Sequence, residues 1–171
     1  KVFQDQIMIQ ELQAGYGKSD IQLLGNFSNV IAYALEKGAP LKGNLQLKSK
    51  EIFLDELAAK SAQSSPDTTQ KTASGVVLIP ENLNLTLTAD AGKIYFDSMI
   101  ISQLKGKLTL NKGLLKLEES SLQLVEALFK MSATYKALSP ENAIFDYKIK
   151  AENFDIQKAY TEIPMFRTLL S

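Results

Sequence analysis

The 171-residue chain contains no cysteine, no histidine and no tryptophan. No disulfide can form, and the residues that most often bind zinc or copper or act as general bases are missing. The formal net charge is zero, with 19 basic and 19 acidic residues. This balance argues against nucleic acid as a partner, because proteins that bind it usually carry excess positive charge. The longest apolar clusters are far shorter than the roughly 20 residues of a membrane helix.

The remaining residues form no recognisable catalytic arrangement. Serines are numerous, but there is no Gly-x-Ser-x-Gly elbow and no histidine to activate one. The adjacent carboxylates Asp55–Glu56 and Glu118–Glu119 would point to opposite faces of a strand, so they would not converge as an acid–base pair. No glycine-rich loop resembles a phosphate-binding loop. We therefore predict no catalytic residue, no metal site and no cofactor.

Apolar residues make up 45% of the chain, and many alternate with polar ones. The alternation is most regular between Ala127 and Ala151, on both sides of a turn at 139–142. A period of two is typical of strands with one apolar and one polar face. The sequence therefore predicts a mostly β protein, as a curled antiparallel sheet or an open β-groove built from repeated strand pairs. Similar alternation occurs at 21–27, 41–49, 83–89 and 104–110.

Breaks in the alternation predict helices and turns. Helical spacing predicts short helices at about 28–37 and 155–170, with Asp155 as the cap of the second and Pro164 dividing it. We expect a turn at 90–93 between two strands. Two further features are predicted: a three-residue hairpin loop at Asn111-Lys112-Gly113, and a bulge at 118–121, where the alternation changes phase.

Residues 58–76 are small, polar and aperiodic, which is typical of a flexible linker or long loop. They divide the chain into an N-terminal strand group at 1–57 and a larger C-terminal β module with its terminal helix at 77–171. The chain begins at Lys1 without a methionine or a signal peptide. We expect it to be part of a longer protein whose membrane anchor lies outside it.

Large apolar side chains gather on one predicted face of the last two strands. From the residues alone, the favoured interpretation is a core packed against a helix or a second sheet. The alternative is a groove open to a hydrophobic ligand, which needs no catalytic residues. The candidate groove residues are Phe129, Met131, Tyr135, Phe145, Tyr147 and Ile149.

Two stretches of the C-terminal part carry a recurring pattern. The first stretch has a proline–asparagine start, an aspartate-rich strand end, a leucine–glycine hairpin and a following leucine strand. Its sequence is IPENLNLTLTADAGKIYFDSMIISQLKGKLTLNKGLLKLEESSLQL. ALFKMSATYKAL and AIFDYKIKAENFDIQKAYTEI then make a strand, a turn, a strand and a helix. Over about 77–171 these features resemble the AsmA-like family of bacterial envelope proteins, which are related to TamB. One departure is Glu126-Ala127-Leu128, where relatives often have glycines.

The resemblance implies a periplasmic module of a protein anchored in the inner membrane of a Gram-negative bacterium. Relatives take part in outer-membrane biogenesis, and the long ones form β-grooves thought to carry phospholipid between membranes. The expected function is therefore non-enzymatic: binding or transport of phospholipid or another acyl-chain lipid, with adjacent β modules of the same protein as further partners. The alternatives are a structural or protein-interaction module with a fully packed core and, least favoured, a glycan-acting enzyme.

Overall fold

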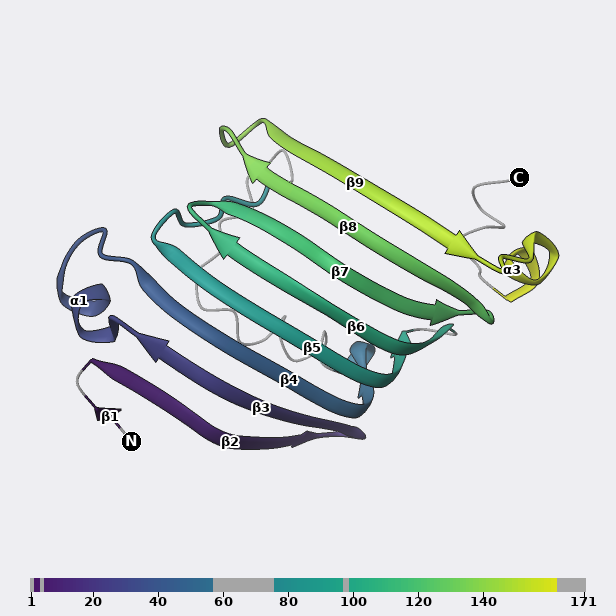
Figure 1. Cartoon of the computed structure of the whole chain (residues 1–171), viewed down its shortest axis with the longest axis horizontal. Coiled ribbons are helices and arrows are strands. Elements are labelled where there is room, and N and C mark those ends of the chain that lie inside the picture. The colour runs from purple at the N-terminus through teal and green to yellow at the C-terminus, as the bar shows by residue number, and fades with distance from the viewer. Residues whose placement is uncertain (1, 4, 57–75, 97–98, 163–171) are drawn as a thin grey trace.

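The computed structural model describes residues 2–3, 5–56, 76–96 and 99–162, and these form one curled, open sheet with short helices at its ends (Figure 1). Nine strands lie side by side in the order of the sequence. The predicted mostly β fold is confirmed. The strands are β1 (Val2–Phe3), β2 (Gln6–Tyr16), β3 (Ser19–Ser28), β4 (Leu41–Phe53), β5 (Leu83–Phe96), β6 (Met99–Asn111), β7 (Leu114–Leu124), β8 (Ala127–Ala137) and β9 (Ala143–Glu152).

One strand pair departs from the antiparallel arrangement that the alternation suggested. β4 and β5 run parallel, from Leu41 opposite Leu83 to Phe53 opposite Tyr95. This pairing joins the two predicted strand groups into a single sheet. A parallel pair requires the chain to return from the end of one strand to the start of the next. Most of that connection, at 57–75, lies outside the described residues, and so does most of the predicted linker.

The prediction of a turn at 90–93 is wrong, because β5 continues through these residues. Gly92 lies against β4 instead: a Cβ built on it would be 2.7 Å from the carbonyl oxygen of Lys50. The glycine therefore permits a close approach of two strands and does not reverse the chain. Beside this contact Ala91 and Ile94 are both buried, and with Ile52 they form a small core.

The other predicted irregularities are found where the sequence placed them. The β6–β7 loop consists of Lys112 and Gly113, with φ of 49° and 72°, so the hairpin is in place but has two loop residues where three were expected. Positive φ at both positions suits the twist of the flanking strands. The β7 bulge is confirmed by a register shift between Leu117 and Ser120, with Glu119 at φ 49°.

Two helices lie where the sequence predicts them, and both are short. α1 (Val30–Leu35) lies within the predicted range 28–37, and α3 (Ile156–Glu162) within 155–170. Asp155 caps α3 as expected, accepting hydrogen bonds from the backbone N–H groups of Gln157 and Lys158 at 2.8 and 3.1 Å. Residues 163–171, with the predicted break at Pro164, are outside the described part. Within the described residues no helix is long and apolar enough to cross a membrane.

Candidate functional site

The strand register places apolar residues of eight strands on one face of the sheet. Residues directly opposite each other in paired strands lie on the same face, so the pairing can be followed across β2 to β9 as rows. We call the surface made by these rows the apolar face. One row contains Ile7, Phe27, Gly43, Leu85, Leu110, Leu115, Tyr135 and Phe145; the next contains Ile9, Gly25, Leu45, Leu87, Leu108, Leu117, Ala133 and Tyr147.

The six candidate groove residues all lie on this face, on the adjacent strands β8 and β9. We call them the aromatic patch: Phe129, Met131, Tyr135, Phe145, Tyr147 and Ile149. Tyr135 is opposite Phe145, and Met131 is opposite Ile149. The rings of Phe145 and Tyr147 stack at 5.5 Å between centroids. The structure therefore brings together every residue that the sequence proposed for this site.

The part of the aromatic patch on β9 is open to solvent. Phe145, Tyr147 and Ile149 are 61%, 68% and 55% exposed, whereas the three members on β8 are half-buried. β9 is the last strand of the sheet, and no described element pairs with its outer side. Among the described residues only five apolar side chains are buried: Ile52, Ala91, Ile94, Ala127 and Ala159. Within the described part of the chain, the apolar face is thus not fully packed.

Two contacts cover the ends of the aromatic patch. At one end, segment 76–80, which we call the strap, meets Tyr135: the backbone N–H of Val77 donates to the Tyr135 hydroxyl at 2.9 Å, and the hydroxyl donates to the Val77 carbonyl at 3.0 Å. In Figure 1 the strap passes behind the end of the β6–β7 hairpin on its way to β5. At the other end, the ring of Phe154 meets that of Phe129 edge to face at 5.8 Å. Sequence reasoning missed both Val77 and Phe154 as parts of this site.

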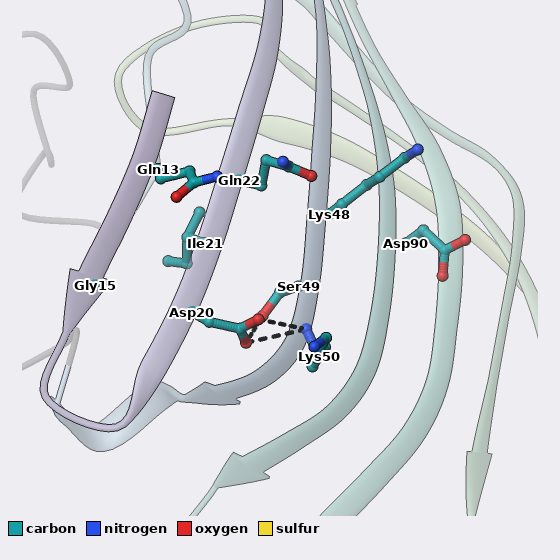
Figure 2. Close-up of a pocket in the computed structure, with 9 residues that line it drawn as sticks. All are labelled: Gln13, Gly15, Asp20, Ile21, Gln22, Lys48, Ser49, Lys50 and Asp90. Atoms are coloured by element: carbon teal, nitrogen blue, oxygen red, sulfur yellow. Dashed lines mark hydrogen bonds between the residues drawn. The ribbon is translucent and has the colours of Figure 1, made fainter. Parts of the chain in front are cut away.

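The opposite face of the sheet is polar and holds shallow depressions. One charge-lined depression near the N-terminal strands has a volume of about 620 Å³ (Figure 2). Gln22, Lys48 and Asp90 lie side by side there on β3, β4 and β5. Charges of both signs border the depression, so it offers no net selectivity for an anion or a cation. Among the described residues no group of three or more acidic side chains could hold a metal ion.

Asp20 beside this depression has a structural role. Its carboxylate accepts hydrogen bonds from the backbone N–H of Lys50 at 3.0 Å and from the Ser49 hydroxyl at 3.1 Å (Figure 2). It also accepts one from the backbone N–H of Glu51 at 2.8 Å. Ladder pairing between β3 and β4 ends at Gln22 and Lys48, so the carboxylate serves β4 amides beyond the last pair. These bonds, led by that from Glu51, lower the pKa of Asp20 below its usual value.

The adjacent carboxylates noted in the sequence face different partners. Glu56 accepts a hydrogen bond from the backbone N–H of Lys18 at 3.0 Å. Glu118 pairs with Lys116 on its own strand and with Lys107 on β6, at 3.7 Å for the latter. The ammonium of Lys116 is the main cause of a lowered pKa at Glu118, which stays ionised and tied to lysines. Glu56 thus bonds to the turn between β2 and β3, and Glu118 joins β7 to β6.

Comparison of the chain with protein-family models, with curated proteins and with solved structures finds no match in any of the three. The resemblance to the AsmA-like family therefore stays a prediction from the motifs.

Proposed function

We propose that this chain is a non-enzymatic lipid-binding module, which holds the acyl chain of a phospholipid or a related lipid on its apolar face. The observation that carries the proposal is the exposure of the β9 half of the aromatic patch. Large contiguous apolar surfaces on a protein usually mark a binding site for another molecule. The polar side chains of the same strands lie on the opposite face of the sheet, and that face can remain in contact with water.

Burial of an acyl chain supplies enough free energy for such binding. Each buried methylene contributes roughly 0.8 kcal/mol, so ten methylenes contribute about 8 kcal/mol before the cost of ordering the chain. A sheet face contacts only one side of the acyl chain, so the binding free energy it supplies is a part of this total of about 8 kcal/mol. No charged or catalytic side chain is required, which agrees with the composition of the patch.

With the family resemblance, this proposal extends to the cell. The module would act in the periplasm, in a protein attached to the inner membrane through a segment outside this chain, and would serve outer-membrane biogenesis through phospholipid binding or transfer between membranes. These statements depend on the motifs of residues 77–171 and not on the geometry of the patch.

Native mass spectrometry of the purified protein tests the proposal. We expect bound phospholipid, either co-purified or after reconstitution with lipid. The double variant Phe145→Ser/Tyr147→Ser removes two exposed rings from the patch and should lose most of the lipid. Ile144→Ser is the matched control, because Ile144 is 49% exposed on the same strand but on the opposite face. Absence of lipid after reconstitution, or equal loss in the control, would refute lipid binding at this site.

A second candidate is favoured by the outer edge of β9. An unpaired edge strand presents backbone N–H and C=O groups to which another strand can add. In that function the β9 edge joins an adjacent β module, which also covers the patch. This candidate would be supported over the first if the protein forms defined oligomers without lipid and if replacing Lys148 with proline abolishes them.

A further inference from the structure

We infer that the strap fixes the length of acyl chain that the aromatic patch accepts, and that Tyr135 is the residue that positions the strap. This inference rests on the proposed function, since it assigns a selectivity to the same surface. The patch is covered at two ends: Phe154 contacts Phe129 at one end, and Val77 contacts Tyr135 at the other.

The distance between these ends can be obtained from the strand. Phe129 and Tyr135 are six residues apart on β8, so at about 3.4 Å per residue the stretch that the described residues leave uncovered is about 20 Å long. One lipid tail spans about half of a bilayer core of roughly 30 Å. The uncovered stretch therefore has room for one extended tail of common length, lying along the strands over Met131, Ile149 and Tyr147.

The strap is held by specific contacts and is not simply resting on the sheet. Tyr135 both accepts from and donates to the backbone of Val77, so the loss of one hydroxyl removes two hydrogen bonds. Further along, the strap passes the β6–β7 loop, where a Cβ on Gly113 would be 3.4 Å from the carbonyl oxygen of Ile79. The chain is then tied to the start of β4 through the backbone N–H of Leu41, which donates to the Asn82 carbonyl at 2.9 Å.

The contact at Val77 is thus the point where the strap can lift from the patch while its later part stays attached. A tail longer than the uncovered stretch would have to displace Val77 from Tyr135 or leave its excess methylenes in water. In either case the methylenes beyond the stretch add little affinity. Phe154 sets the opposite limit in the same way.

Binding of saturated fatty acids of increasing length to the whole chain tests this inference. For the unchanged protein we expect affinity to rise by up to about fourfold per methylene from decanoate to about palmitate, and then to level off through behenate. Tyr135→Phe keeps the ring but releases Val77, so the rise should continue to longer fatty acids. Tyr33→Phe is the matched control: it removes an exposed tyrosine hydroxyl from α1, outside the aromatic patch, and should leave the plateau in place.

A second variant and a second measurement protect the test from a folding defect. Val77→Pro removes the N–H donor that Tyr135 accepts from and should shift the plateau in the same direction. Hydrogen exchange at Val77 should become faster in Tyr135→Phe than in Tyr33→Phe. If the unchanged protein binds no fatty acid, the proposed function itself fails. If it binds and levels off at the same length in Tyr135→Phe and Val77→Pro, or does not level off at all, only the inference about the strap is overturned.

Discussion

Replacing Gly106 with alanine tests how closely β6 and β7 approach at the bulge. A Cβ on Gly106 would lie 2.5 Å from the hydroxyl oxygen of Ser120 and 3.2 Å from its Cβ. Ser120 is 3% exposed and donates a hydrogen bond to the Glu118 carbonyl at 3.3 Å. Its hydroxyl can rotate only at the expense of that bond, and the contact with its Cβ would stay too short. The strands must therefore separate locally.

The magnitude follows from two opposing contributions. Overpacking in a tight site costs about 1 to 3 kcal/mol, and replacing glycine by alanine within a strand recovers about 0.5 to 1 kcal/mol. We expect Gly106→Ala to lower the free energy of unfolding by about 1 to 2 kcal/mol. Ser120→Gly removes both atoms that block the new methyl group, so the double variant should recover most of the loss.

Urea denaturation followed by circular dichroism measures all four proteins of this double-mutant cycle. A loss of 1 kcal/mol shifts the midpoint by about 0.5 M when the denaturant slope is about 2 kcal/mol/M. We expect a coupling free energy of at least about 1 kcal/mol between the two positions. A coupling near zero, or a Gly106→Ala variant more stable than the parent, would show that the strands are not in contact here.

Two further predictions concern other irregular positions. Asp20→Asn should destabilise the fold by about 1 kcal/mol at neutral pH, because a neutral amide is a weaker acceptor at an exposed site. The lowered pKa of Asp20 makes this contribution complete above about pH 4 and lost as the pH falls further, so the unfolding free energies of the two proteins should converge in acid; an unchanged difference would contradict this role. Glu126→Gly should stabilise by about 0.5 to 1 kcal/mol, since relief of the left-handed φ of 64° exceeds the loss of the exposed ion pair with Lys158. Thermal unfolding should show a rise of about 1 to 4 °C, with a smaller gain for Glu126→Asn; an equal or lower midpoint for Glu126→Gly would refute strain in this loop.

Strand positions were predictable because each half-buried strand carries its own pattern. At 104–110 every second residue is leucine or glycine, and the glycine at 113 permits the left-handed loop position that follows. The composition of the aromatic patch was predictable for the same reason. Tyr135 and Phe145 each belong to the apolar set of their own strand. A shift of the hairpin pairing by two residues leaves both sets on the same face, so the two rings share a face in either register.

The direction of β5 and the covering of the patch were not predictable, because neither is local. Alternation is the same in parallel and antiparallel strands, so nothing near Leu83 reveals that β5 runs alongside β4 in the same direction. The sequence favours a turn at Gly92, because the backbone of Lys50, which this glycine allows to approach closely, is remote in sequence. The strap has no periodicity, and its partner at Tyr135 lies 58 residues further along the chain.

The parallel pairing of β4 and β5 explains both the continuity of the apolar face and its partial covering. The pairing places Leu45 opposite Leu87, and a shift of one residue would bring the threonines of β5 to the apolar face instead. The same pairing requires a connection that returns along the sheet, and its last part reaches the patch at Val77, above Tyr135. A hairpin between antiparallel strands would need only a short turn and would leave that end of the patch uncovered. The chemistry of the patch therefore follows from local alternation, whereas the length of its open part follows from the topology of a single junction.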